Sequence, residues 1–446
     1  MIKFKKQLRP INGDIKVQGD VDISYFSIIM ASLAMGKSKI YGLNENKNTL
    51  NLIEIFRQFG VKIEKEDDGN WVVYGNGLKS LTEPINIVDI KLSKEILYLL
   101  VGLFSSYNFK IFFKGDDTLS NTDLIEVFSI FKSLNVNFAG RSDRYLPFLM
   151  MGNTEKKPIN YEVNDYNSVI KNAMLLASLN GNPEKENIVK EKEKSKNHLE
   201  ILMKYFGILL EEHEIGSKLS LNIKIGREIN IKGNQDFSGK EIIIPADVSF
   251  SSFIAALAIL IPDSNIVLKN VLMNQHRDAF YRTLIDMGAD ILFTNQKIVC
   301  GEKISDISIK YRKLRDTIIP ANRIYKMMYE YPILIFIACM TDVNIEIQGI
   351  RNIKFQELYN YNSILETVRE LGITFDEADD SLKIKNKNID KTREIIISDK
   401  IEDARIRLTI ALFGLFINNS IELDDSIEDS FPNLKEFLMS IGLNVE

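Results

Sequence analysis

The chain has 446 residues and a balanced charge, with 56 Lys and Arg against 61 Asp and Glu and a net charge of −5. This balance excludes a global electrostatic attraction to nucleic acid or to a membrane, and the length predicts two or three domains. The two cysteines are too few for a disulfide framework, and Cys339 lies in an apolar run typical of a protein core. No signal peptide or membrane span is indicated. We therefore expect a cytoplasmic protein with no nucleic-acid or membrane partner.

One pattern recurs six times along the chain. An amphipathic helix ends at a glycine, or once at an asparagine, and an alternating strand follows at once. The residues at these six helix ends are Gly60, Asn135, Gly207, Gly288, Gly372 and Gly442. Glycine, and after it asparagine, tolerates the left-handed conformation that ends a helix. Because the copies are roughly 70–85 residues apart, too far for a solenoid, the pattern predicts six copies of one α/β unit.

Each copy also contains a second helix that is apolar on nearly all sides. These helices are expected at residues 26–34, 96–104, 169–179, 253–261, 333–340 and 406–416. A helix that is apolar all round must be buried inside a domain. Most of them precede an alternating strand, so the unit reads strand, buried helix, strand, amphipathic helix and two strands. In the first copy, the last two strands are expected at 61–65 and 71–74, joined by a hairpin turn.

Three such units, with buried helices inside and sheets outside, surround every buried helix with neighbours. Six units then give two domains. We predict that residues 19–243 form one domain, and that residues 1–18 and 244–446 form the other.

Two segments at the domain boundaries resemble each other. Each places an aspartate, Asp20 or Asp247, just before a buried helix. A cleft between the domains that is lined by helix N-termini would be a natural site for an anion. The alternative is that each aspartate only caps its helix.

The six units, the paired aspartate segments and the run Ser430-Phe431-Pro432-Asn433 together resemble the enolpyruvyl transferase family, and within it the EPSP synthases. The resemblance covers essentially the whole chain. It implies an α/β (α+β) fold in two domains, an inverse α/β barrel that closes on its substrates. It also implies transfer of the enolpyruvyl group of phosphoenolpyruvate to shikimate 3-phosphate, in the shikimate pathway of aromatic amino acid biosynthesis, without a metal or organic cofactor.

Many positions that bind anions in that family carry other residues here. Both family substrates bear a phosphate and a carboxylate, so their cleft requires arginine and lysine. In the stretch that matches Gly-Asp-Lys-Ser-x-Ser-x-Arg, the lysine, the first serine and the arginine are Val21, Asp22 and Phe26. Other family cations and a proton-handling aspartate fall on Thr122, Gln356, Asn360 and Tyr329. Since each truncated partner of a buried charge pair costs about 2–5 kcal/mol, we expect the family reaction to be impaired or lost.

Six residues still match family motifs and form the predicted site. Glu357 is the candidate catalytic residue. The candidate substrate-binding residues are Ser168, Ser195, Lys196, Asp247 and Arg405. If a family ligand is still recognised, we expect it to be the sugar phosphate, held through the two serines. The alternative for each serine is that it only caps a helix.

Three functions therefore stay open on the sequence alone. The chain is a homologue without catalysis that keeps a binding or regulatory role, an enzyme for a different and less anionic substrate, or an active EPSP synthase with a rearranged site. The sequence allows a small-molecule anion as the ligand of the interdomain cleft and does not identify it. A monomer is expected.

Overall fold

The computed structural model describes the chain except for residues 8, 156, 164–166, 217–225, 387–391, 393 and 399, and except for the side chains of residues 355–357 and 385–386. The described residues form two compact units. Unit 1 comprises Met1–Gln18, Pro245–Ile298 and Lys303–Glu446, and unit 2 comprises Gly19–Ile244 and Val299–Glu302. The short segment 299–302 thus groups with unit 2, whereas the sequence analysis assigned it to the other domain.

The six predicted buried helices are confirmed. They are α1 (Val21–Leu33), α3 (Lys94–Phe104), α6 (Ser168–Leu179), α8 (Val248–Leu260), α11 (Tyr331–Met340) and α13 (Ala404–Phe413). In α1, every residue after the first is buried, including three serines. Helices α1 and α8 begin five residues earlier than predicted. The prediction placed their starts at the first residue of the apolar run, whereas the helices begin directly after their capping residues, Asp20 and Asp247.

The six amphipathic helices also end where the sequence predicts. They are α2 (Lys47–Gln58), α5 (Ile125–Ser133), α7 (His198–Phe206), α9 (Ala279–Asp286), α12 (Ile350–Glu370) and α14 (Leu434–Ser440). The terminating residues all have positive φ: Gly60 (86°), Asn135 (65°), Gly207 (97°), Gly288 (90°), Gly372 (76°) and Gly442 (87°). Two further short helices are α4 (Asp117–Ser120) and α10 (Ala321–Ile324).

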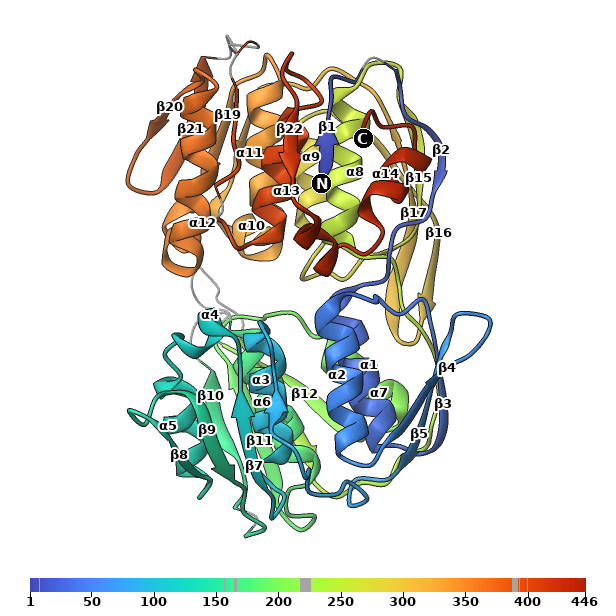
Figure 1. Ribbon diagram of the computed structural model, residues 1–446, viewed down its shortest axis with the longest axis vertical. Coiled ribbons are helices and arrows are strands. Elements are labelled where there is room, and N and C mark those ends of the chain that lie inside the picture. Colours follow the sequence, from blue (N-terminus) through green and yellow to red (C-terminus); the bar gives the residue numbers. More distant parts are fainter. Residues whose placement is uncertain are drawn as a thin grey trace. The chain divides into compact units, whose positions relative to one another are not determined.

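Unit 2 contains three four-stranded sheets with one shared topology. In order, they are β14 (Glu241–Ile243), β3 (Met35–Tyr41), β5 (Trp71–Asn76) and β4 (Lys62–Lys65); β6 (Val88–Asp89), β7 (Lys110–Lys114), β9 (Tyr145–Met151) and β8 (Asn137–Arg141); and β10 (Asn160–Val163), β11 (Glu186–Glu191), β13 (Gly226–Lys232) and β12 (Leu210–Ile215). The first pair of each sheet is parallel and the other two pairs are antiparallel. Strands β3–β5 and β7–β9 lie on opposite sides of the helices of this unit (Figure 1).

Unit 1 repeats this topology twice and then departs from it. The two sheets are, in order, β16 (Asp290–Val299), β17 (Glu302–Lys310), β15 (Asn265–Leu272) and β2 (Asn12–Ile15), and β18 (Thr317–Ile319), β19 (Ile345–Gln348), β21 (Ser381–Asn386) and β20 (Thr374–Glu377). Among the described residues, the sixth copy forms a two-stranded antiparallel sheet instead, of β1 (Ile2–Phe4) and β22 (Ile421–Leu423). The sequence predicts six equivalent units, but the described part of the sixth copy has two strands in its sheet where the other copies have four.

Two strands are exchanged between copies. In a copy without exchange, β6 precedes the buried helix α3 and pairs in parallel with β7, the strand that follows the same helix. Strand β2 precedes α1 but pairs with β15, and β14 precedes α8 but pairs with β3. Gly19 lies directly after the first exchange, where an added Cβ would stand 2.1 Å from the Gly42 carbonyl oxygen. Only glycine allows this close approach of the backbone.

Helices α3 and α6 cross so closely that one glycine controls their distance. A Cβ added at Gly102 would lie 2.2 Å from the carbonyl oxygen of Ala173 and 2.7 Å from its Cα. These contacts are to backbone atoms, which cannot rotate away as a side chain can. The crossing is therefore set by the missing side chain at Gly102.

We expect Gly102→Ala to destabilise unit 2, although alanine is favoured over glycine by about 1 kcal/mol inside a helix. Overpacking of a filled core costs about 1–3 kcal/mol, and here the clash is with backbone, so we expect a net loss of about 1–2 kcal/mol. Trp71, the single tryptophan, is buried in unit 2 and reports its unfolding in urea by fluorescence. The control is Ser129→Ala on the exposed side of α5, which should be neutral; a neutral Gly102→Ala would show that the two helices can move apart.

Candidate functional site

The N-terminus of α1, where the sequence analysis expected an anion, carries two carboxylates. Asp20 caps the helix by accepting a hydrogen bond of 3.0 Å from the Ile23 N–H. Asp22, in the first turn, forms an ion pair with Lys196, with 2.9 Å between the Oδ2 and Nζ atoms. Phe26, at the position of a family arginine, is 2 % exposed. Acidic side chains interact favourably with a helix N-terminus, so the protein itself supplies the negative charge at this end of α1.

The loop that carries two predicted site residues is bound to the interior by charged groups. Ser195 donates from its hydroxyl to Glu191 Oε2 at 2.7 Å, and from its backbone N–H to Oε1 of the same carboxylate at 3.2 Å. The Nζ of Lys171 donates to the carbonyl oxygen of Lys196. These three hydrogen bonds fix the positions of both Ser195 and Lys196.

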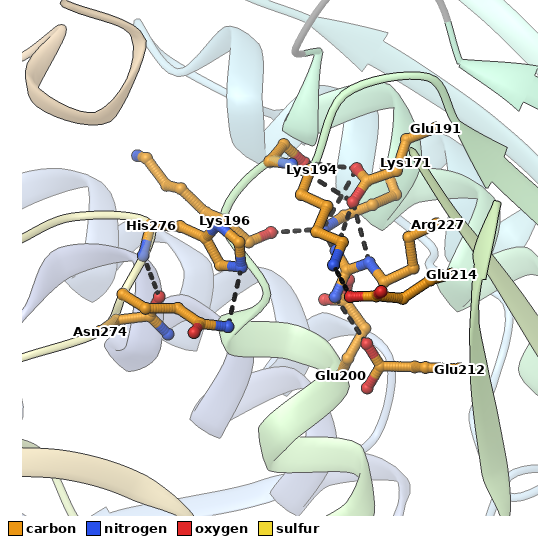
Figure 2. Close-up of polar contacts among 12 residues, drawn as sticks. Lys171, Glu191, Lys194, Lys196, Glu200, Glu212, Glu214, Arg227, Asn274 and His276 are labelled. Carbon is orange, nitrogen blue, oxygen red and sulfur yellow. Dashed lines mark hydrogen bonds and ion pairs between the residues drawn. The ribbon is translucent and has the colours of Figure 1, made fainter. Parts of the chain in front are cut away.

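Glu191 and Lys171 belong to a buried network of charges (Figure 2). Lys171 lies 2.6 Å from Glu200, and both side chains are 0 % exposed. Arg227 bonds to Glu191 through Nε at 2.9 Å, to Glu200 at 3.1 Å and to Glu212 at 2.7 Å. The network joins α6, α7, β11, β12 and β13. A buried charge is tolerated only when it is paired and hydrogen-bonded, and each of these groups meets that condition.

The pKa of Glu191 shows the balance of forces in this network. Burial raises the pKa of the Glu191 carboxyl, but the charges of Lys171 and Arg227 and the hydrogen bonds from Ser195 and Arg227 more than offset burial, so the pKa is lowered from its ordinary value of 4.5. The pKa of Arg227 is raised, because the nearby carboxylates outweigh its desolvation. Both groups are therefore charged at neutral pH.

Neither predicted serine caps a helix, so the alternative stated for them is wrong. Helix α6 is capped by Asn167, whose Oδ1 accepts from the Ile170 N–H at 3.1 Å, and Ser168 is the first helical residue and half-buried. Ser195 lies three residues before α7 and bonds to Glu191 instead. The structure does not assign a ligand to either serine.

In unit 1, the predicted residue Asp247 caps α8. Its Oδ1 accepts from the Phe250 N–H at 2.7 Å, and the residue is 6 % exposed. Close to this end of α8, the hydroxyl of Ser249 donates to Glu330 and accepts from Arg277 at 2.7 Å. Arg277 and Glu330 are not among the six predicted site residues, although both are almost fully buried. In the sequence, the available signal was a charged residue next to the start of a helix, since Arg277 lies just before α9 and Glu330 just before α11.

Arg405, the predicted cation of unit 1, is paired with Asp403, which caps the same helix, α13. Its Nε donates to Asp403 Oδ1 at 3.0 Å, and Asn360 donates to Oδ2 of the same carboxylate at 3.0 Å. Burial raises the pKa of the Asp403 carboxyl, but the charge of Arg405 and the hydrogen bonds that the carboxylate accepts outweigh burial, so the pKa is lowered from its ordinary value. The guanidinium lies 4.6 Å from the ring centre of Tyr329, within the range of a cation–π interaction.

The remaining predicted residue, Glu357, lies on α12, and its side chain is outside the described part of the structure. The six predicted residues therefore fall into three groups. Ser195 and Lys196 share one loop of unit 2 near α1, Ser168 starts α6 of the same unit, and Asp247, Arg405 and Glu357 belong to unit 1.

No group of three or more His, Cys, Asp or Glu side chains among the described residues could hold a metal ion. None of the helices in the described ranges is long and apolar enough to cross a membrane.

Comparison with known proteins identifies the family. The profile of EPSP synthase (3-phosphoshikimate 1-carboxyvinyltransferase) matches residues 5–438. The chain belongs to the EPSP synthase family. The 3-phosphoshikimate 1-carboxyvinyltransferase of Paramagnetospirillum magneticum is 29 % identical over 444 residues, covering 99 % of this chain and 97 % of that protein. That of Paracoccus denitrificans is 28 % identical over 440 residues, covering 98 % and 96 %.

A solved structure confirms the mixed α/β fold. The EPSP synthase of Acinetobacter baumannii superimposes with a TM-score of 0.85 at 23 % identity, over 100 % of this chain and 99 % of that one. The resemblance recognised in the sequence is thus confirmed at the level of family and fold. The reaction of the family is enolpyruvyl transfer in the shikimate pathway.

We expect Glu191→Gln to destabilise unit 2 by about 3–5 kcal/mol at pH 7, because loss of one partner leaves buried cations uncompensated. The lowered pKa of Glu191 also sets a pH dependence. A carboxyl with a lowered pKa stabilises the folded state fully above its unfolded value, 4.5, and this contribution is lost as the pH falls through the folded value. Urea unfolding of the wild type, followed by Trp71, should therefore show lower stability at pH 4 than at pH 7.

The variant should lose part of this acid dependence, since glutamine does not titrate. The matched control is Glu162→Gln, which breaks the exposed pair of Glu162 and Lys192 and should change stability little. Equal stability of Glu191→Gln and Glu162→Gln at pH 7 would contradict the role assigned to the buried network.

Proposed function

We propose that this chain is a member of the EPSP synthase family that no longer transfers enolpyruvyl groups and that keeps the fold for a binding or regulatory role. The observation that carries the proposal is that the cations matching family motifs, Lys196 and Arg405, are each paired with a carboxylate of their own unit. A cation neutralised in this way attracts an anionic substrate less. As part of the proposal, we take the protein to be monomeric and cytoplasmic.

Unit 2 supports the proposal through its donors. The hydroxyl and N–H of Ser195 bond to Glu191, and Lys196 bonds to Asp22. These are the groups that the resemblance implies for the sugar phosphate. A phosphate would have to compete with two carboxylates that are already in place and whose hydrogen bonds are charge-assisted, hence strong.

Unit 1 supports it through the residues around Arg405. Tyr329 stands where the family has a proton-handling aspartate, and a phenol with an ordinary pKa near 10 is a poor proton acceptor at neutral pH. Its ring lies against the guanidinium of Arg405 at 4.6 Å and against that of Arg277 at 5.7 Å. Asn360 replaces a family cation and bonds to Asp403 instead.

We expect the purified protein to release no inorganic phosphate above background from phosphoenolpyruvate and shikimate 3-phosphate. Loss of two buried charge contacts alone, at about 2–5 kcal/mol each, slows a reaction by about a thousandfold or more, because 1.36 kcal/mol is tenfold in rate. The EPSP synthase of Acinetobacter baumannii, assayed in parallel, is the positive control.

A variant at the candidate catalytic residue distinguishes release of phosphate by this protein from release by a contaminating enzyme. If the wild type does release phosphate, Glu357→Gln, at the candidate catalytic residue, should be compared with it. A rate that falls with this substitution would reject the proposal and establish an active enzyme with a rearranged site. A rate that is unchanged would assign the release to a contaminant and leave the proposal standing.

A further inference from the structure

The loop of Ser195 and Lys196 presents three hydrogen-bond donors, and an internal carboxylate meets each of them. Glu191 accepts from the N–H and the hydroxyl of Ser195, and Asp22 accepts from the Nζ of Lys196. Two neutral donors and one ammonium on adjacent residues are a donor set suited to the oxygens of a phosphate group. Here the oxygens come from the protein.

The two carboxylates differ in how firmly they are held. The side chain of Glu191 is 3 % exposed and also faces Arg227 and Lys171. The side chains of Asp22 and Lys196 are 12 % and 21 % exposed, so solvent reaches this pair. Displacement of Glu191 would break the buried network, whereas displacement of Asp22 would not. The pair of Asp22 and Lys196 is therefore the contact at which an external anion could compete.

Carboxylates other than Asp22 also act on the first turns of α1. Burial raises the pKa of the Tyr25 hydroxyl, and the charges of Glu95 and Asp22 raise it further. Asp22 also follows the capping residue Asp20 at the start of α1, where the helix dipole would otherwise favour a ligand anion. With Asp22 present, a second anion at Lys196 meets repulsion as well as competition.

We propose that Asp22 is an autoinhibitory counter-anion: its carboxylate occupies the position of a phosphate group on Lys196 and closes an anion site that the loop and α1 would otherwise form. This inference rests on the proposed function, because it accounts for a fold that retains the donors yet does not bind the anion. The ligand class of the opened site is a phosphate monoester or inorganic phosphate. Substitution of Asp22 removes this counter-ion of Lys196 and leaves the cap Asp20 intact.

The test is phosphate binding by the full-length protein with Asp22→Ser. Inorganic phosphate is titrated by calorimetry at constant ionic strength, with chloride as the balancing anion. We expect the variant to bind phosphate at least tenfold more tightly than the wild type. The double variant Asp22→Ser/Lys196→Met should lose this gain. Equal affinity of Asp22→Ser and wild type, or a gain that persists without Lys196, would overturn the proposal.

Two more variants separate the charge of Asp22 from the size of its side chain and from the release of a lysine elsewhere. Asp22→Asn keeps the size of the side chain, so it decides the question if Asp22→Ser does not fold, and it should show the same gain. Glu162→Gln releases Lys192, an exposed lysine of the same unit, from its ion pair, and it should show no gain. A gain equal to that of Asp22→Ser in this control would overturn the proposal, because loss of a carboxylate beside any lysine would then suffice.

This result is independent of the assay for enolpyruvyl transfer. If Asp22→Ser gains no affinity while the wild type is inactive, only the autoinhibitory role of Asp22 fails. If the wild type releases phosphate from the family substrates with dependence on Glu357, the proposed function fails, and the titration of Asp22→Ser still decides whether Asp22 closes an anion site.

Discussion

The buried ion pair of Lys171 and Glu200 is the contact on which the predicted site of unit 2 depends. Both side chains are fully buried, so neither charge can be solvated by water if the other is lost. Through Arg227 and Glu191, the pair extends to the loop that carries Ser195 and Lys196. Interior charges therefore hold that loop in position.

This arrangement shows how a family fold can persist while its anion-binding groups change. The six buried helices and the strand pairings rest on apolar burial and backbone hydrogen bonds, and none of these requires Val21, Phe26 or Tyr329 to be basic or acidic. Phe26, at 2 % exposure, even adds apolar area to the core. Under the proposed function, loss of cations at the helix N-termini costs binding, and it costs the fold little.

The sequence predicted the fold well because its signals are local. The glycines that end helices could be recognised because the residue after a helix often has a positive φ, which glycine adopts without strain. Asn135, with a φ of 65°, shows that asparagine can take the same place. The exchange of β2 and β14 was not predicted, because it depends on pairing partners about 200 to 250 residues away. The buried network was missed for the same reason: Lys171 reads as one charge in an apolar helix, and its partners follow only in three dimensions.

The candidate site shows why a match to a motif is not sufficient evidence of ligand binding. Lys196 and Arg405 were selected because they stand where the family has cations, and in the structure each faces a carboxylate, Asp22 or Asp403. Asp22 is 174 residues from Lys196 in sequence, so no local pattern could reveal the pair. Once an aspartate occupies position 22, a lysine at 196 is required to neutralise it, whether or not a ligand binds. A retained cation is therefore evidence of binding only when its counter-ion is absent from the protein.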